Sequence, residues 1–254
     1  MKISCDKMLS IVIISKNEEQ CLPRLLDSIK RQGIDENKYE IILSDANSTD
    51  KTREIAQSFG CRIVDGGLPS KGRNNGARAA KGDLLLFLDS DVVLPKNFLR
   101  YNLNEFLQRK LVSGTTIYRP MSRKMVDKFF YATYNFLALI TQLFSPHAGG
   151  FCIFIKKETF DDIGGFNENI LFAEDMDLVK RSGKTGNFRI LSGPPILCDV
   201  RRMEKEGRAH FAIKYVYAEL RRMVLGDRDG APFNYDMQGV NIKEEAQRMK
   251  KIEA

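Results

Sequence analysis

Two aspartates one residue apart follow an apolar run and could hold a metal ion. Asp89-Ser90-Asp91 comes directly after residues 84–88, LLLFL, and alternate strand residues point the same way, with Cα atoms about 6.6 Å apart. Two oxygens on one Mg²⁺ are at most about 4.2 Å apart, so the carboxylates must lean together or one must act through water. The triplet predicts a site for a hard divalent cation; the alternative is that Asp91 caps a helix near Pro95.

A second polar segment, residues 44–50, also follows an apolar run. The carboxylate of Asp45 could accept hydrogen bonds from a nucleotide base or ribose. Its neighbours Ser48 and Asp50 fit turn and helix-cap roles, because small polar side chains bond to free backbone N–H groups there. We therefore expect a ligand contact from Asp45 alone in this segment.

Residues 71–76, KGRNNG, are expected to form a flexible loop before a helix. Its cations Lys71 and Arg73 suit a phosphate or a ribose, although a lone arginine is more often solvated. Further along the chain stands the acidic pair Glu174-Asp175. Such a pair is typical of a helix N-terminus, but a buried carboxylate in a cleft could instead deprotonate an acceptor hydroxyl.

Other catalytic frameworks are missing from the sequence. There is no G-x-G-x-x-G after the first apolar run, no Walker loop, no G-x-S-x-G and no H-E-x-x-H. The two histidines, His147 and His210, have no nucleophile motif nearby. The acidic and basic segments together indicate an enzyme that acts on a nucleotide-bound group through a divalent metal.

Length and composition indicate a globular chain. Its 254 residues, 43% hydrophobic and 29% charged, suffice for one large domain or two small ones and exclude disordered, collagenous and disulfide-scaffold classes. The five cysteines are scattered without a Cys-x-x-Cys pair, which disfavours zinc and disulfides. A polar segment from Ser15 ends the first apolar run, so we expect no signal peptide and a cytoplasmic location.

The net charge of +7 is concentrated in two segments. Residues 119–128 hold four cations against one acid, and residues 201–226 hold seven against three. These two segments together account for the whole net charge. An acidic partner is therefore expected to meet the second half of the chain.

Apolar runs and helical patterns alternate in the first half of the chain. Runs without polar alternation are typical of strands covered on both faces, and they are expected at 9–14, 41–43, 63–64 and 84–88. Helices are expected from near Gln20 with Pro23 in the first turn, from 48–50 to Gly60, and over 73–81. This alternation predicts an open, doubly wound α/β sheet with its ligand at the carboxyl ends of the strands.

The second half is less regular. Residues 111–118 and 151–155 are expected to be strands, and 175–181 a short helix. Residues 129–144 carry no charge; as a helix they extend about 24 Å, short of the roughly 30 Å hydrocarbon core of a bilayer. They should lie in a membrane interface or pack against protein.

The order of the motifs resembles that of the family 2 glycosyltransferases, which have a GT-A fold and belong to the nucleotide-diphospho-sugar transferases. The matching segments, between about Leu9 and Gly186, are IVIISKNEE, LSDANSTDKT, GRNNGARAAKGDLLLFLDSDV and GGFNE…FAEDMDL. The resemblance implies a doubly wound, mostly parallel central sheet with helices on both faces and a C-terminal helical extension. The expected divisions are a catalytic domain over 1–200 (donor half 1–118, acceptor half 119–200), a basic helix over 201–226 and a polar, partly mobile tail over 227–254.

The resemblance also implies site residues and a cofactor. Contacts with a UDP- or GDP-linked sugar fall on Ile14, Ser15, Asn17, Glu18, Asp45, Lys71, Arg73, Asp89 and Ser90. The resemblance implies that Mn²⁺ or Mg²⁺ is bound by Asp91, as the direct ligand, and by Asp89. It also implies that Gly149 and Gly150 line the acceptor side. Asp175 would be the catalytic base of an inverting enzyme, with Glu174 beside it.

The sequence departs from the family pattern in several places. Ala46 stands where a second acidic residue is common, so only Asp45 carries over. The Gln-x-x-Arg-Trp motif of processive synthases is absent, which favours a single addition. His210 could be a further metal ligand or a structural residue, and the pair Arg201-Arg202 could hold the leaving diphosphate or be solvated.

Basic segments beside a charge-free helix favour an acceptor at a lipid surface. Contact through residues 119–145 would suit an anionic membrane, with a polyprenyl phosphate or glycolipid acceptor and a peripheral location on the inner face of the cell membrane. A core helix or a homodimer contact stays equally open, and no nucleic-acid partner is expected.

Three other functions stay open from the sequence. They are a retaining GT-A glycosyltransferase acting on a soluble acceptor, a nucleotidyltransferase, and a non-catalytic basic module that binds nucleic acid. A nucleotidyltransferase would usually need a glycine-rich loop after the first strand, where residues 15–18 read SKNE. A nucleic-acid module would need aromatic residues among its cations, and residues 129–144 are too apolar for that.

Overall fold

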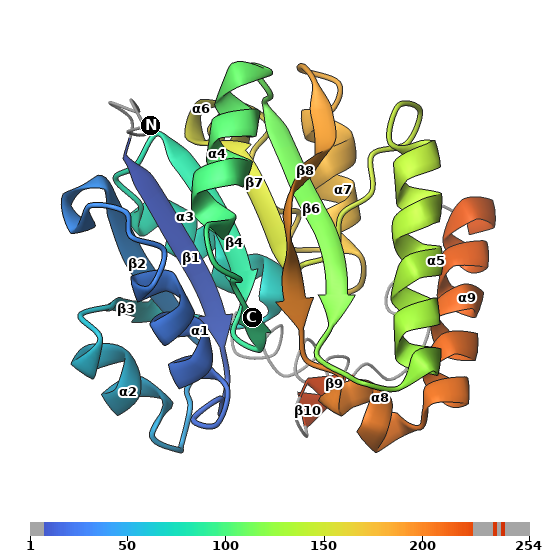
Figure 1. The fold of residues 1–254 in the computed structure, drawn as a ribbon, viewed down its shortest axis with the longest axis horizontal. Coiled ribbons are helices and arrows are strands. Elements are labelled where there is room, and N and C mark those ends of the chain that lie inside the picture. The colour runs from blue at the N-terminus through green and yellow to red at the C-terminus, as the bar shows by residue number, and fades with distance from the viewer. Residues whose placement is uncertain (1–7, 226–235, 238–239, 242–254) are drawn as a thin grey trace, which may run out of the picture.

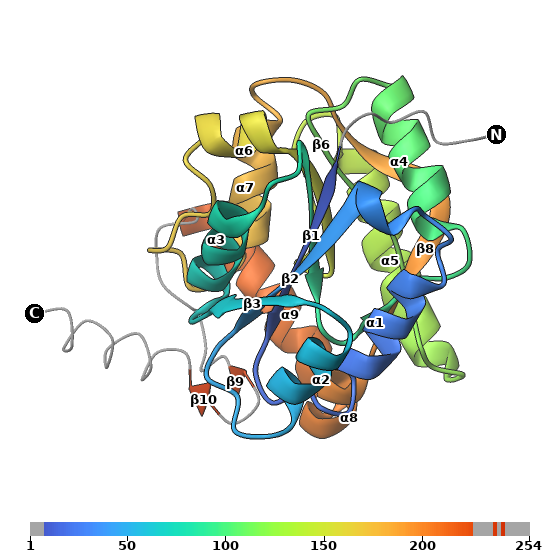
Figure 2. The same ribbon diagram turned by 90° about the vertical axis from the view of Figure 1, so that its left-hand side faces the viewer.

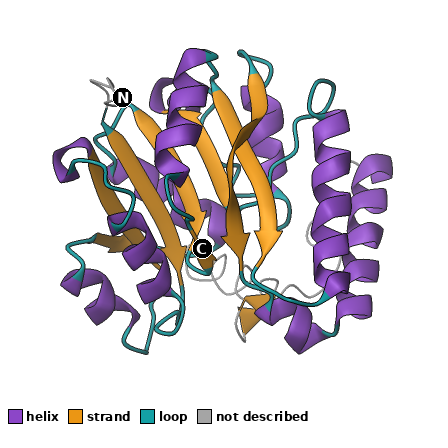
Figure 3. Cartoon of the chain, viewed as in Figure 1, coloured by secondary structure: helices purple, strands orange, loops and turns teal. Residues whose placement is uncertain are grey.

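A mixed β-sheet positions the polar segments identified above. The computed structural model describes residues 8–225, 236–237 and 240–241. Within this part of the chain, eight strands form one sheet in the order β3-β2-β1-β4-β7-β6-β8-β5 (Figures 1 and 3). The strands are β1 Leu9–Ser15, β2 Tyr39–Asp45, β3 Arg62–Asp65, β4 Leu84–Asp89, β5 Val92–Val93, β6 Ser113–Pro120, β7 Cys152–Lys156 and β8 Phe188–Cys198, with a separate pair of β9 Asp236–Met237 and β10 Val240–Asn241.

Strand directions confirm the predicted doubly wound, mostly parallel sheet. The strands β3, β2, β1 and β4 are all parallel, β7 is antiparallel to β4 and β6, and β8 is parallel to β6. The chain runs outward from β1 to β3 and returns to the other side of β1 as β4. This order makes a switch point between β1 and β4, where ligands bind in open α/β sheets.

Helices cover both faces of the sheet (Figure 2). Their bounds are α1 Leu22–Lys30, α2 Thr52–Ser58, α3 Pro69–Ala79, α4 Phe98–Gln108, α5 Met125–Thr141, α6 Lys157–Asp162, α7 Glu174–Ser182, α8 Arg201–Glu206 and α9 Arg208–Leu225. Because strand side chains alternate between faces, Ile11 and Ile13 pack in the core beneath α1 and α4, whereas Val12 packs in the core beneath α3, α6 and α7. Apolar side chains on both faces explain the uninterrupted apolar runs.

The strand β8 was not predicted from the sequence. Its residues 188–198 include Ser192, Gly193 and two prolines, which are local signals for a turn. The strand continues because its pairing with β6 shifts register at this point, between Thr116 and Tyr118. A register irregularity of this kind absorbs residues that cannot join the hydrogen-bonded ladder.

The predicted helix over 73–81 is confirmed as α3 but begins earlier, at Pro69, so the predicted loop over residues 71–76 is wrong. The helix begins at Pro69, so Lys71 and Arg73 lie on helical backbone. The two glycines that suggested a loop instead allow close packing: a Cβ on Gly76 would overlap Val12, and one on Gly72 would lie 3.3 Å from Ile14 Cγ2. The glycines therefore bring α3 onto β1.

The C-terminal extension also differs from its prediction. Instead of one basic helix over 201–226, α8 and α9 are separated by Gly207, whose φ of +83° breaks the helix. Val92 of the expected donor half pairs with Cys198 of the expected acceptor half, so the sheet is continuous across that boundary. The predicted mobility of residues 227–254 falls on positions outside the described residues, apart from β9 and β10.

The charge-free stretch at 129–144 lies mostly within α5. Among the described residues, no helix is both long enough and apolar enough to cross a membrane.

We expect Gly76→Ala to lower the free energy of unfolding by about 1–3 kcal/mol, because the added methyl group overlaps Val12. Urea denaturation measures the change. Val12→Ala supplies the matched background: with the valine methyl groups removed, Gly76→Ala should be neutral or stabilising by up to about 1 kcal/mol from helix propensity. An equal loss in both backgrounds would show that the Val12 contact is not the cause.

Candidate active site

A cavity opens at the carboxyl ends of β1, β2 and β4, at the predicted switch point. Its volume is about 100 Å³. It is lined by Ile14, Ser15, Lys16, Glu18, Ser44, Ala46, Gly67, Pro69, Arg73, Asp89, Ser90, Asp91, Glu174 and Arg202. Residues separated by more than 180 positions in the sequence thus meet at one site, among them most of the residues predicted to bind the donor.

Several buried polar atoms of this cavity have no hydrogen-bond partner among the described residues. They are Ser15 Oγ, Ser44 Oγ, Arg73 Nε and Asp91 Oδ1. Buried polar groups in folded proteins are nearly always hydrogen-bonded, and a group without a partner costs about 1–3 kcal/mol. Their gathering in one cavity indicates a binding site for a polar ligand.

Arg73 crosses the cavity and is only 3% exposed. Its Nη2 donates to Asp89 Oδ1 at 2.8 Å and its Nη1 to Glu174 Oε1 at 2.6 Å, and the guanidinium lies 5.4 Å from the ring centre of Phe166. Burial alone would lower the pKa of Arg73, but the charges of Asp89 and Glu174 outweigh it and raise that pKa above its ordinary value. The arginine therefore joins the end of β4 to the start of α7.

Asp91 of the Asp-x-Asp triplet has a buried carboxylate oxygen, Oδ1, without a hydrogen-bond partner. Burial, together with the charges of Asp89 and Glu18, raises the pKa of Asp91 to about 7. Such a group is stabilised by an added cation, so the residues present fit a divalent metal. The structure excludes the alternative helix cap at Asp91, because α4 begins only at Phe98.

The described residues contain no cluster of three or more His, Cys, Asp or Glu side chains that could hold a metal ion. His210, the third predicted ligand, is exposed on α9 and does not line the cavity. Mg²⁺ and similar ions are usually bound by one or two carboxylates, with substrate phosphates and water completing the shell. A site built on Asp91 and Asp89 would need such oxygens from its ligand.

Glu174 and Asp175 occupy the first turn of α7, and Glu174 lines the cavity. Asp175 Oδ1 accepts a hydrogen bond from the backbone N–H of Met176 at 2.8 Å. Burial and the neighbouring charge of Glu174 raise the pKa of Asp175 to about 7, against the opposing effect of Arg73. Asp175 is thereby suited to accept a proton near neutral pH.

The predicted acceptor glycines lie against Arg73. A Cβ on Gly150 would overlap the Arg73 guanidinium. Gly149 donates its N–H to Tyr118 Oη at 2.8 Å, and the same hydroxyl donates to the Gly149 carbonyl at 3.1 Å. The glycine at position 150 is therefore required by close approach, and Tyr118 holds the loop beside the cavity.

On the other side of the cavity, Arg201 and Arg202 differ in their surroundings. Arg201 Nη2 lies 2.9 Å from Glu18 Oε2 and 4.0 Å from Asp91 Oδ2. Burial raises the pKa of Glu18, and the charge of Arg201 opposes that rise. Arg201 is thus engaged with Glu18, while Arg202 lines the cavity itself.

Three predicted nucleotide contacts, Asp45, Asn17 and Lys71, do not line the cavity. Asp45 is fully buried, and its carboxylate accepts hydrogen bonds from the backbone and hydroxyl of Ser48 and from Arg53. Asn17 has a φ of +54° and accepts the Thr49 N–H at 2.8 Å. These two residues shape the loops after β1 and β2. Lys71 likewise stands outside the lining, with its aliphatic chain beside Gly67.

Some residues that line the cavity were not predicted from the sequence. Lys16, Gly67 and Pro69 were given no role, although Lys16 follows the first strand and donates to the Ala46 carbonyl at 3.0 Å. Ser44 could have been found, since it lies at the carboxyl end of β2. The roles assigned to all of these residues stay predictions.

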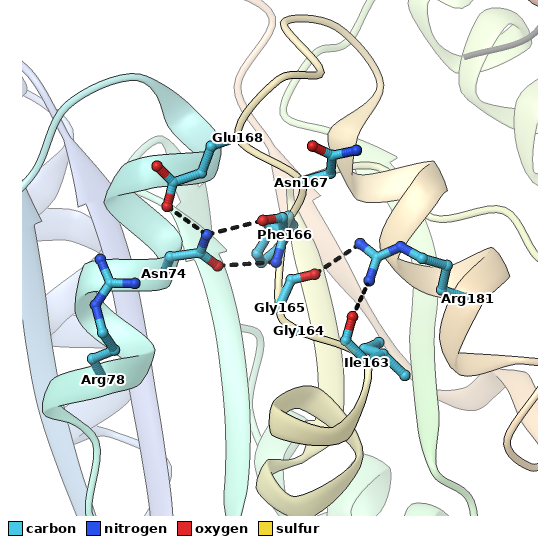
Figure 4. Close-up of a pocket in the computed structure, with 9 residues that line it drawn as sticks. All are labelled: Asn74, Arg78, Ile163, Gly164, Gly165, Phe166, Asn167, Glu168 and Arg181. Atoms are coloured by element: carbon cyan, nitrogen blue, oxygen red, sulfur yellow. Dashed lines mark hydrogen bonds between the residues drawn. The ribbon is translucent and has the colours of Figure 1, made fainter. Parts of the chain in front are cut away.

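A second cavity, of about 480 Å³, lies between α3 and α7, beside residues 163–168 (Figure 4). Asn74 bonds both backbone groups of Phe166 and the carboxylate of Glu168, and Arg181 donates to the carbonyls of Ile163 and Gly165. The polar groups here bond to one another. They clamp the segment before α7 between two helices and so fix the position of Glu174.

The sheet order, its switch point and the acidic cavity define an α/β protein of the nucleotide-binding type. The family model of glycosyl transferase family 2 matches residues 10–164. The chain belongs to this family, as the motif order predicted.

Similar proteins agree with this assignment. An uncharacterized glycosyltransferase of Haemophilus influenzae is 31% identical over 182 residues, which cover 68% of this chain and 60% of that protein. The chain thus spans about three fifths of the length of that relative.

Solved structures show the same fold. A mannosyltransferase from Pyrobaculum calidifontis, in complex with GDP-Man and Mn²⁺, aligns with a TM-score of 0.68 and 20% identity over 90% of this chain and 67% of its own. TarS 1–349 of S. aureus, in complex with UDP-GlcNAc, aligns with a TM-score of 0.66 and 17% identity. This alignment covers 96% of our chain and 71% of the TarS chain. The predicted GT-A fold is confirmed.

We expect Arg73→Met to lower the free energy of unfolding by about 3 kcal/mol, because Asp89 and Glu174 would face each other without their shared cation. Urea denaturation measures the loss. Arg78→Met, an exposed position on the same helix, is the control and should change stability by less than about 0.5 kcal/mol. Equal effects of the two substitutions would contradict a central role for Arg73.

Proposed function

We propose that the protein transfers a sugar from a UDP- or GDP-linked donor to an acceptor hydroxyl or phosphate. The observation that carries the proposal is the gathering of unbonded polar atoms from Ser15, Ser44 and Asp91 in one cavity at the switch point of the sheet. Related structures that contain GDP-Man or UDP-GlcNAc support the donor class. Because the cavity is small compared with typical ligand pockets of 300–1,000 Å³, part of the donor would lie on its rim.

Metal dependence is part of the proposal. Asp91, with its unbonded oxygen, and Asp89 would hold Mn²⁺ or Mg²⁺ together with diphosphate oxygens of the donor. The bound ion would neutralise charge on the departing nucleoside diphosphate. Arg202 lines the same cavity and adds a second positive charge for that diphosphate.

For a hydroxyl acceptor, Asp175 is proposed as the catalytic base. Its carboxylate takes the hydroxyl proton, the acceptor oxygen bonds to the anomeric carbon, and the nucleoside diphosphate leaves from the opposite face with the bonding electron pair. This displacement inverts the anomeric configuration. Glu174, fixed by Arg73, keeps negative charge beside Asp175 and so favours proton uptake.

The retaining alternative makes a different product. Inversion and retention are distinguished by the one-bond coupling constant between C1 and H1 of the transferred sugar, measured by NMR on the product. A product with the configuration of the donor would overturn the inverting proposal and leave the glycosyltransferase proposal intact. The nucleotidyltransferase and nucleic-acid-binding alternatives lose support, because the chain belongs to a glycosyltransferase family.

Titration calorimetry with UDP, GDP, CDP and ADP, each with and without Mn²⁺, tests donor binding. We expect one of UDP and GDP to bind, with an affinity that requires Mn²⁺ and that falls below about pH 7, where Asp91 becomes protonated. Asp91→Ala should weaken this binding at least about tenfold, and Asp162→Ala, an exposed aspartate on α6, should not. Failure of all four nucleotides to bind would overturn the proposed donor site.

Asp175→Asn should reduce turnover by at least about a hundredfold with a hydroxyl acceptor while leaving donor affinity nearly unchanged. In the wild type, the turnover rate should fall as the pH drops through about 7, because the base must be deprotonated. A phosphate acceptor is already ionised and needs no base, so its transfer should survive the substitution. Wild-type turnover of a hydroxyl acceptor by the variant would exclude Asp175 as the base.

A further inference from the structure

The exposed large apolar side chains of the chain gather on two helices. Among residues whose side chains are described, Tyr101 alone lies elsewhere. The others form what we name the α5/α9 face: Met125, Val126, Phe129, Phe136, Leu137, Leu139, Ile140, Leu143, Phe144, Ile213, Val216 and Tyr217. Phe144 is 91% exposed and Met125 74%. Contiguous apolar patches of this kind mark binding surfaces in folded proteins.

The apolar residues of α5 lie on one side of the helix. Its buried residues Asp127, Tyr131 and Ala138 point toward the protein. At 100° per residue, the exposed residues Phe129, Phe136 and those that follow at helical spacing fall on the opposite side. This outward side carries no charge over more than four turns. It has the pattern of a core helix but is exposed.

Specific contacts hold α9 beside α5 (Figure 1). Arg208 Nε donates to Asp127 Oδ1 at 2.6 Å, and the rings of Phe130 and Phe211 pack with centroids 5.8 Å apart. Hydrogen bonds from Arg208 lower the pKa of Asp127, so this buried acid stays ionised and paired. The two helices therefore form one unit.

The positive charge at one end of this unit is only partly paired: Lys124 Nζ lies 3.6 Å from Glu204 Oε1, and Glu204 is shared with Arg208. Arg119, Arg123, Lys124 and Lys128 are all exposed around the start of α5. The acid in that segment, Asp127, is buried and bonded to Arg208. An apolar side bordered by exposed cations is complementary to an anionic bilayer, where apolar residues enter the interface and cations meet lipid phosphates.

We propose that the α5/α9 face is the docking surface for an anionic lipid bilayer. A second copy of the chain would also cover the apolar residues, but the exposed cations Arg119, Arg123 and Lys128 favour a surface that presents phosphate groups. No described helix can span a bilayer, so the contact lies in the interface plane. The docked bilayer is thus the partner that best satisfies both the apolar and the charged residues.

Docking through this face would also bring the loop that carries the predicted acceptor residues Gly149 and Gly150 close to the bilayer. The side chain of Asn135 on α5 bonds both backbone groups of Tyr118, and Tyr118 holds Gly149 beside the cavity. Phe144 and Gly150 are six positions apart, a reach of at most about 20 Å. Insofar as the proposed transferase function holds, a lipid-linked phosphate or hydroxyl in the bilayer is the acceptor class that fits.

Vesicle flotation tests the docking directly, without donor or acceptor. Wild-type protein should float with vesicles of phosphatidylcholine and phosphatidylglycerol, and much less with phosphatidylcholine alone. Phe136→Gln/Ile140→Gln should weaken binding roughly tenfold or more, and so should Arg123→Gln/Lys128→Gln on anionic vesicles. Tyr101→Gln, an exposed aromatic substitution on α4, is the control and should bind as the wild type does.

Two results would overturn the proposal. One is absence of binding to both vesicle types; the other is a dimer, seen by analytical ultracentrifugation, that Phe136→Gln/Ile140→Gln converts to a monomer without affecting flotation. Because all substituted residues are exposed, circular dichroism and thermal unfolding should confirm unchanged folding. Nucleotide calorimetry contains no lipid, so a failure of docking and a failure of the donor site are separately visible.

Discussion

The guanidinium of Arg73 lies almost out of contact with water and shares its charge between Asp89 and Glu174. Removing a charge from water costs several kcal/mol, and only close ionised partners offset that cost. The arginine therefore dictates what surrounds it: a carboxylate at the end of β4, another at the start of α7, and a glycine at position 150 that leaves room for it. Arg73 thus links the sheet to the acidic helix at the cavity, in addition to the core packing of α7 and the hydrogen bond between Ser113 and Ser182.

Close packing brings the arginine to that position. Gly72 and Gly76 let α3 lie against β1, where larger residues would hold the helix away from the sheet. The next residue, Asn74, bonds the backbone of Phe166, whose ring lies beside the Arg73 guanidinium. Two neighbouring side chains of one helix thus serve different tasks: Arg73 presents a charge to the cavity, and Asn74 fastens the segment before Glu174.

Apolar residues have two uses in this chain. In β1 and β4 they fill the core on both faces of the sheet, as the uninterrupted runs in the sequence predicted. In α5 a comparable run is half exposed: Asp127, Tyr131 and Ala138 are buried and Phe130 and Tyr134 pack partly against the core, whereas the residues on the outward side are exposed. Helical periodicity cannot distinguish these cases, since burial depends on which elements lie alongside.

The sequence by itself determined the sheet type, most of the strands, the family and the segments that carry the acidic motifs, because apolar periodicity and motif order are local properties. Tertiary structure decided that the predicted helix at Arg73 begins early enough to include Lys71, that Asp91 has a buried oxygen without a hydrogen-bond partner, and that Asp45 holds a loop in place. It also revealed β8, whose local residues signal a turn. These features depend on partners far apart in the chain, such as Glu174 for Arg73, 101 positions away, and no local pattern encodes a contact over that separation.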